Sequence, residues 1–160
     1  MKLKIITHPV FSASQSMPKF AELIISGMKS RGHQVETLSA KPVTYRFPAP
    51  QRLKKWLGYI DQFLIFPIQI LRELKKDPID TVYIFADQAL GPWVPLVAHR
   101  AHVIHVHDFM ALRSSLGEYH QNPVSLTGRI YQKIIRFGFG CGKRFVSVSA
   151  NSQADLHRFL

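Results

Sequence analysis

Ile104-His105-Val106-His107-Asp108-Phe109 is the stretch that decides the fold. Its apolar residues, with Val103 before them, alternate in the way that is typical of a buried strand. His107 and Asp108 follow where that strand is expected to end, and ligands of open parallel sheets bind just beyond the carboxyl ends of strands. An imidazole and a carboxylate there can accept, donate and orient protons near neutral pH. We therefore expect an α/β protein in which His107 and Asp108 are candidate catalytic residues.

Outward from this stretch, predicted strands and helices alternate along the chain. The predicted strands cover residues 4–7, 33–38, 81–85, 103–107 and 145–149, and the predicted helices cover residues 18–31, 51–76, 88–100, 124–137 and 151 onward. We expect the second helix to be kinked or broken at Pro67, residues 110–122 to form a polar loop, and the glycines at 138, 140 and 142 to end the fourth helix. Alternation of this kind predicts a Rossmann-like, doubly wound parallel sheet covered on both faces.

Length and composition are those of one ordered globular domain. The chain has 160 residues, of which 46% are hydrophobic and 19% charged. Its single cysteine, Cys141, cannot form an internal disulfide, which favours a reducing cytosol. A formal charge of +11 indicates an anionic partner: nucleic acid, a membrane surface or a phosphorylated substrate. No segment is long and apolar enough for a signal peptide or for a spanning helix, which needs about 20 residues.

Several motifs are excluded by their context. The glycine-rich run at 138–143 is expected to follow a helix and precede a strand, whereas a phosphate loop follows a strand and opens a helix. The chain has neither a G-x-G-x-x-G dinucleotide fingerprint nor a G-x-S-x-G elbow. His102 and His105 have no nearby cluster of further ligands, so packing or hydrogen-bonding roles are favoured over zinc. The chain also lacks an Asp-x-Asp pair, and we expect neither a metal nor a cofactor.

Three segments resemble one known family. Residues 14–23 with 30–35 look like the family's first loop, helix and R-G-H-x-V turn. Residues 104–109 look like its strand ending in His-Asp, and residues 145–152 look like its late strand with serine. In this respect the chain resembles the N-terminal domain of GT-B glycosyltransferases, in particular the retaining enzymes of family 4. The resemblance implies that residues 1–160 are the acceptor-side domain. It also implies a C-terminal donor-binding domain, with an E-x7-E motif, in the same or a partner chain.

The resemblance implies a sugar transfer from a nucleotide-sugar donor to a saccharide or lipid-linked acceptor, as in polysaccharide biosynthesis. His107 would lie beside the donor sugar and its diphosphate. Asp108 either holds that imidazole or accepts N–H groups of the following loop. Candidate substrate-binding residues are Ser14, Gln15 and Ser16 of the first loop, where many family members have a Gly-Gly pair, together with Asp87, Arg113 and Tyr119. The last two are otherwise solvated loop residues.

A basic segment points to a membrane surface. Residues 41–76 contain eight basic and two acidic residues. We expect a stripe of Leu53, Leu57, Ile60 and Leu64 to cover the sheet, which leaves a stripe of Trp56, Tyr59, Phe63 and Phe66 exposed unless a second layer buries it. A basic helix with spare aromatic residues is typical of binding to anionic membranes. We therefore expect Arg52, Lys54, Lys55 and Trp56 to bind a membrane, and the protein to be cytoplasmic and peripheral at its inner face.

A second function class remains open at this point. A non-catalytic, basic Rossmann-like module that binds a membrane or nucleic acid and recruits a partner would have the same fold and charge. Nucleic acid is the weaker of these ligands because no recognition motif accompanies the basic residues. An adjacent E-x7-E domain would favour the enzyme.

Overall fold

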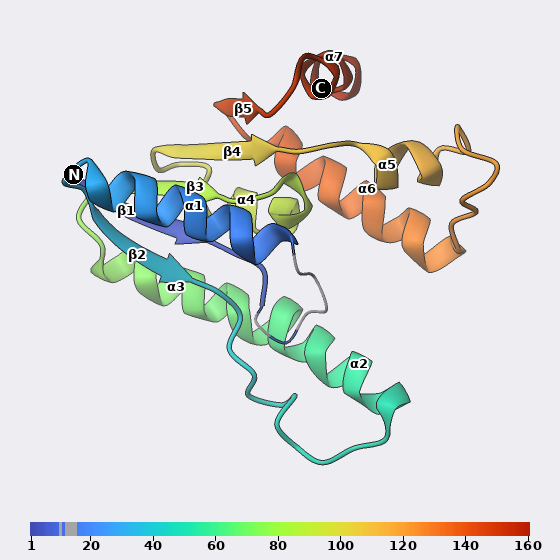
Figure 1. The fold of residues 1–160 in the computed structure, drawn as a ribbon. Helices are drawn as coiled ribbons and strands as arrows, with labels where there is room; N and C mark the ends of the chain where they lie inside the picture. Colours follow the sequence, from blue (N-terminus) through green and yellow to red (C-terminus); the bar gives the residue numbers. More distant parts are fainter. Residues whose placement is uncertain (10, 12–15) are drawn as a thin grey trace.

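The computed structural model describes residues 1–9, 11 and 16–160. Its centre is a sheet of five parallel strands in the order β2-β1-β3-β4-β5 (Figure 1). The strands are β1 (Lys2–Ile6), β2 (Gln34–Leu38), β3 (Val82–Phe85), β4 (His102–Val106) and β5 (Phe145–Ser147). The strand order reverses between β1 and β3, which makes their carboxyl ends the switch point of the sheet. The predicted α/β, Rossmann-like doubly wound fold is confirmed.

Helices cover both faces of the sheet. α1 (Ser16–Ser30) lies on one face, where its Phe20 ring contacts His105 of β4. The other face is covered by α3 (Phe66–Lys76), α4 (Val94–Val97) and α6 (Leu126–Gly140), which contact one another in sequence. α7 (Ala150–Phe159) follows β5 at the edge of the sheet. A right-handed connection between each pair of parallel strands requires this distribution of helices.

The central strands are apolar on both sides because both of their faces are covered. Ile5 of β1 pairs with Ile84 of β3, and Phe85 of β3 pairs with Ile104 of β4. All four side chains are buried. Each contributes about 1.5–3 kcal/mol through burial of apolar surface, so these three strands form the stable centre of the domain.

One charged network lies inside the fold, beneath the amino ends of β1 and β3. Lys4 of β1 is only 1% exposed, and its ammonium group lies 2.7 Å from both Asp77 and Glu73. Lys2 lies 2.8 Å from Asp77, and the Tyr83 hydroxyl donates to Asp77 at 2.7 Å. Burial by itself would raise the pKa of Asp77, but hydrogen bonds from Lys2, Lys4 and Tyr83 outweigh it and hold that pKa below its usual value. A lysine can be buried here because its charge is paired.

The segment 51–76 is helical throughout but changes its phase. α2 (Gln51–Ile60) passes into a π-helical turn, η1 (Asp61–Ile65), which leads directly into α3. The helix is not broken at Pro67, which lies in the first turn of α3; the change in helical geometry comes before this proline, at η1. A π turn holds more residues than an α turn and therefore rotates the helix that follows it.

This rotation contradicts the predicted stripes. Leu53 and Leu64 were expected to cover the sheet but are 54% and 64% exposed. Phe66 was expected to be exposed but is buried, and Phe63 packs on Trp93 at a ring-centroid distance of 6.1 Å. The stripe assignment assumed one unbroken α-helical period, and η1 changes that period for Leu64 and Phe66. Leu53 precedes η1 and is exposed because α2 extends away from the sheet (Figure 1).

Two further predictions are wrong in detail. The expected loop 110–122 begins with a short helix, α5 (Met110–Ser115), whose Leu112 is buried. The glycine at 138 does not end α6, which continues to Gly140. Gly138 instead lies against Gly91 of the 3₁₀ helix η2 (Gln88–Trp93): a Cβ at 138 would overlap the Gly91 carbonyl group and lie 2.9 Å from the nitrogen of Pro92. The glycine is needed for backbone contact between two elements, and the run at 138–143 does lie between a helix and a strand.

Candidate functional site

The carboxyl ends of β1, β3 and β4 bring together polar side chains from three parts of the chain. His8 follows β1, Asp87 and Gln88 follow β3, and His107 follows β4. The three strands are neighbours in the sheet, with β3 in the middle. Adjacent strands lie about 4.8 Å apart, so the ends of β1 and β4 are separated by roughly 10 Å. A small polar molecule placed over the end of β3 could contact all three ends.

His8 and Asp87 form a hydrogen-bonded pair across two of these ends. The Nε2 atom of His8 lies 2.9 Å from Oδ2 of Asp87, and the other carboxylate oxygen accepts the backbone N–H of Ala89 at 3.1 Å. An ionised carboxylate only accepts, so Nε2 carries the proton and Nδ1 of a neutral His8 holds the lone pair. The Asp87 side chain is nearly buried and that of His8 is one-fifth exposed. Asp87 is therefore held within the fold, and His8 remains accessible from solvent.

His107 is held by contacts of its ring and of its backbone, whose carbonyl oxygen accepts the hydroxyl of Ser152. Its Nε2 atom lies 3.0 Å from the carbonyl oxygen of Ala86, and its backbone N–H donates to Oε1 of Gln88 at 3.0 Å. The Phe20 ring meets the imidazole edge-on, with 4.2 Å between centroids. A carbonyl oxygen only accepts, so Nε2 again carries the proton and Nδ1 is the nitrogen that can accept one. Phe20 and Ala86 fix the orientation of the ring.

Asp108 does not hold the His107 imidazole, which is bonded to Ala86 instead. Its Oδ1 atom accepts the backbone N–H of Met110 at 2.9 Å, at the start of α5, and the side chain is exposed. Its carbonyl oxygen accepts from the Gln88 side chain at 2.6 Å. Of the two roles considered for Asp108, acceptance of a loop N–H is therefore the one that the structure contains.

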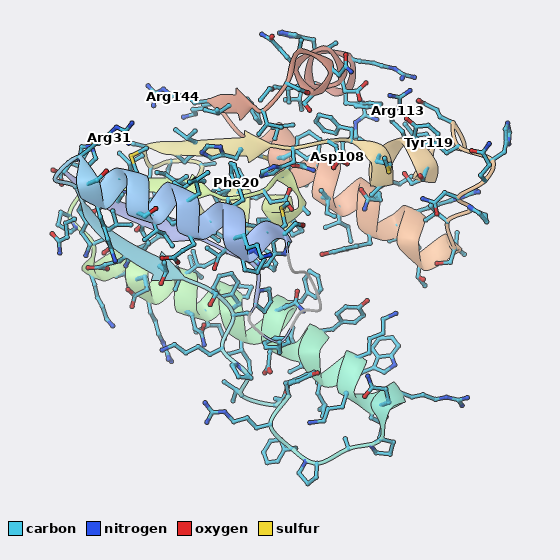
Figure 2. The ribbon with its side chains drawn as sticks, in the orientation of Figure 1. Phe20, Arg31, Asp108, Arg113, Tyr119 and Arg144 are labelled. Atoms are coloured by element: carbon cyan, nitrogen blue, oxygen red, sulfur yellow. The ribbon has the colours of Figure 1, made fainter. Side chains whose placement is uncertain are left out.

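Arg113 lies within α5 and not on a loop, Tyr119 follows that helix, and the two side chains contact each other away from the strand ends (Figure 2). The Arg113 guanidinium bonds to Glu118 at 2.8 Å and lies 5.1 Å from the centre of the Tyr119 ring. Arg113 also reaches Asp155 of α7 at 3.5 Å, and Arg158 of α7 bonds to Glu118 at 2.6 Å. This cluster connects α5 to α7, so a structural role accounts for both residues.

The first-loop candidates cannot all be placed. Ser14 and Gln15 lie outside the described residues. Ser16 is the exposed first residue of α1, whereas the sequence placed the helix start at Pro18.

The two strand histidines have different surroundings. His102 is buried, with Nδ1 2.9 Å from the carbonyl oxygen of Arg100 and Nε2 accepting the N–H of Lys143 at 3.1 Å. This is the hydrogen-bonded packing role that the sequence favoured. His105 is partly buried, and its Nδ1 atom has no hydrogen-bond partner within the described chain. Burial, and secondarily the charge of His107, lower the pKa of His105, so the ring favours its neutral form.

Glu36, Glu73 and Asp77 lie close enough together to resemble a metal-binding group. Lys2 bonds to Glu36 at 3.0 Å and Lys4 bonds to the other two carboxylates. The lysines already supply the positive charge that a metal would bring, so we assign this cluster a structural role.

The expected membrane-binding residues of α2 do not share one environment. Arg52 and Lys55 are exposed, and Trp56 is 66% exposed. Lys54 instead donates to the carbonyl oxygen of Tyr45 at 2.7 Å and lies 4.8 Å from the centre of that ring. It holds the 41–50 loop against α2. None of the described helices is long and apolar enough to cross a membrane.

The sequence did not identify His8, Gln88 or Phe20 as parts of the site. His8 directly follows an apolar strand, as His107 does, and this shared position was an available signal. Gln88 and Phe20 act through tertiary contacts that no local pattern reveals. Comparisons of the chain with protein-family models, curated proteins and solved structures find no match.

Proposed function

We propose that this chain is the acceptor-binding half of a retaining glycosyltransferase that transfers a sugar from a nucleotide sugar to a saccharide or lipid-linked acceptor. The observation that carries the proposal is the His8–Asp87 pair at the sheet switch point, with His107 two strands away. Parallel α/β sheets bind their ligands at this edge. The sequence resemblance to GT-B N-terminal domains supplies the class of reaction.

The chemistry assigned to the site is the positioning of two reactants. During transfer, a bond forms between an acceptor hydroxyl oxygen and the anomeric carbon, the bond from that carbon to the diphosphate oxygen breaks, and the hydroxyl proton passes to Nδ1 of His8. His8, oriented by Asp87, would hydrogen-bond the acceptor hydroxyl through Nδ1. His107, whose Nε2–H is bonded to Ala86, would accept a hydrogen bond from a hydroxyl of the donor sugar through Nδ1 and so orient the donor.

The donor would be held mainly by a C-terminal GT-B domain in the same or a partner chain. Residues 1–160 alone should therefore bind nucleotide sugars weakly and transfer little sugar. The decisive experiment incubates this chain, joined to or mixed with its donor-binding domain, with a panel of nucleotide sugars and lipid-linked or free saccharides. A new glycoside made from one donor supports the proposal. Micromolar binding of a nucleotide sugar to residues 1–160 alone, measured by calorimetry, would contradict the division of roles.

We also propose that α2 attaches the protein to the inner, cytoplasmic face of an anionic membrane. Arg52 and Lys55 are exposed on this helix beside Leu53 and Trp56, which expose more than half of their surfaces. Basic and aromatic side chains on one amphipathic helix suit the boundary between lipid headgroups and acyl chains. A non-catalytic membrane module would use the same surface, and the transfer assay separates it from an enzyme.

A further inference from the structure

A groove of about 500 Å³ lies between α2 with its π turn and α6. Trp56, Tyr59 and Phe63 line one wall, and Ile130, Tyr131 and Ile134 line the other. Its volume lies within the range of about 300–1,000 Å³ that is usual for small-molecule sites. None of the residues that line it belongs to the strand-end site described above, but Tyr131 lies within electrostatic range of Asp87.

A continuous series of aromatic rings runs along the first wall of the groove and crosses to Tyr131 on the other. Trp56 meets Tyr59, Tyr59 meets Phe63, and Phe63 meets Tyr131, each at 5.9 Å between centroids. Phe63 also stacks on the buried Trp93. Burial, followed by the influence of Tyr59 and Asp87, raises the pKa of Tyr131 to about 12, as expected where water is largely excluded. The series thus leads from an exposed tryptophan to the protein core.

Charge is distributed along the groove in one direction. Lys55 lines it, and helical spacing places Arg52 on the same face of α2, one turn nearer its amino end. Ser125 and Thr127, at the amino end of α6, also line the groove. The polar and basic lining residues thus come from the early part of α2 and the amino end of α6, whereas Phe63 and Ile134 come from later turns and make that part of the groove apolar.

We propose that this groove binds one hydrocarbon chain of an anionic lipid. The headgroup lies by Arg52 and Lys55, and the chain runs over Tyr59 and Phe63 towards Ile134. An amphiphile with a negative headgroup fits this arrangement, because the headgroup can pair with the basic side chains and the hydrocarbon chain can pack on the aromatic ones. Trp56 belongs both to the groove and to the membrane-facing surface of α2, so a lipid can enter sideways from the bilayer. The proposal refines the membrane attachment proposed above and does not depend on sugar transfer.

The test uses a single-chain anionic amphiphile, dodecyl phosphate, below its micelle-forming concentration. Titration calorimetry with residues 1–160 should show saturable binding of one molecule, together with a blue shift of the tryptophan emission. Inorganic phosphate and butyl phosphate, which lack the chain, should bind at least tenfold more weakly. Equal binding of butyl and dodecyl phosphate would overturn the proposal.

Two variants on one helix locate the site. Ile134→Glu places a carboxylate in the groove and should weaken binding of dodecyl phosphate at least tenfold. Phe137→Glu, one turn further along α6 and outside the groove, should change it less than twofold. Both side chains are largely exposed, at 46% and 72%, so both variants should fold, which circular dichroism checks. An equal loss in the two variants would mean that the amphiphile binds elsewhere.

Further outcomes separate this inference from its alternatives. Concentration-dependent dimerisation that Ile134→Glu abolishes would show that a second copy of the chain covers the groove, and would overturn the proposal. If the protein binds anionic vesicles but not monomeric dodecyl phosphate, the proposal of membrane attachment through α2 stands and the proposal of lipid binding in the groove is wrong. Sugar transfer that persists in Ile134→Glu leaves the proposed enzyme intact whatever the groove binds.

Discussion

The Nε2 atom of His8 lies 2.9 Å from Oδ2 of Asp87, and this bond joins the ends of β1 and β3 at the point where the strand order reverses. The two residues are far apart in the sequence, and only the parallel pairing of β1 with β3 brings them together. A histidine oriented by a carboxylate is an arrangement that recurs where an imidazole must accept a hydrogen bond or proton in a fixed direction.

Replacing either member of the pair should impair sugar transfer. In the enzyme assembled with its donor-binding domain, His8→Ala and Asp87→Asn should each lower turnover about 10²-fold, as expected for loss of one well-placed polar group. The double variant should be little worse than either single variant, because the two residues act as a unit. His120→Ala, at an exposed histidine, is the control. Additive losses in the double variant would show that the two residues act separately.

His107→Ala should lower turnover by at least about 10²-fold while the protein stays folded. The side chain is only partly buried, and the loss of its bond to Ala86 should cost about 1 kcal/mol of unfolding free energy. Steady-state kinetics and thermal unfolding measure the two effects, with exposed His99→Ala as the control. Turnover within a few-fold of the wild type, with a large fall in melting temperature, would make His107 a structural residue.

Asp77→Asn should lower the unfolding free energy by about 3 kcal/mol, because it leaves buried Lys4 without one of its charge partners. The pKa of Asp77 is depressed in the fold, so its contribution is complete above its unfolded pKa of about 3.9 and is lost as the pH falls through the folded pKa. Urea unfolding at pH 7, 4 and 3 should therefore show a smaller acid effect in the variant than in the wild type. Asp80→Asn, at an exposed site, should change neither the unfolding free energy at pH 7 nor its loss in acid.

Anionic vesicles should bind the protein through α2 and release most of it as salt rises. Each basic residue near the surface contributes about 1 kcal/mol, and salt screens this attraction over about 8 Å. Arg52→Glu with Lys55→Glu should weaken co-sedimentation strongly, whereas Trp56→Ser should remove the salt-resistant fraction.

The charge-matched control for this experiment is Arg72→Glu with Lys75→Glu on α3, both exposed. Equal loss in the two double variants would mean that net charge, and not α2, determines binding. Equal binding of the wild type to neutral and anionic vesicles would reject an anionic surface as the partner.

Gly138→Ala should destabilise the domain by about 1–3 kcal/mol, since the new methyl group would overlap the Gly91 backbone. Gly140→Ala is the control within the same helix: its Cβ would lie 3.6 Å from Leu160, an ordinary contact, and alanine favours the helix. Denaturant midpoints compare the two variants. Similar stability of both would show that α6 shifts to accommodate the methyl group.

The sheet was predictable because its strands are apolar runs that recur between helical segments, and both signals are local. The order of the elements and the location of His107 at a strand end follow from these signals. The exposed faces of residues 51–76 were not predictable, because η1 changes the helical phase and no single residue type marks a π turn. Helix α5 was missed because it has only six residues, too few for a helical period to be recognised.

The candidate site was only half predictable for a related reason. His107 and Asp87 each follow a recognisable strand, so their edge of the sheet was foreseeable. The bond from Asp87 to His8 depends on which strands are neighbours, and the strand order is a property of the whole fold. The cluster that engages Arg113 likewise involves Asp155, a partner distant in sequence.

The contact between Gly138 and Gly91 holds α6 near one of its ends only. It fixes the helix near its carboxyl end, while Leu126 at the opposite end is about 18 Å away at the α-helical rise of about 1.5 Å per residue. A slight tilt about this pivot displaces Thr127 and Ile130 much more than it displaces the residues that pack beside the sheet. Such a tilt would widen the groove for a bulkier ligand while the carboxyl ends of the strands keep their spacing.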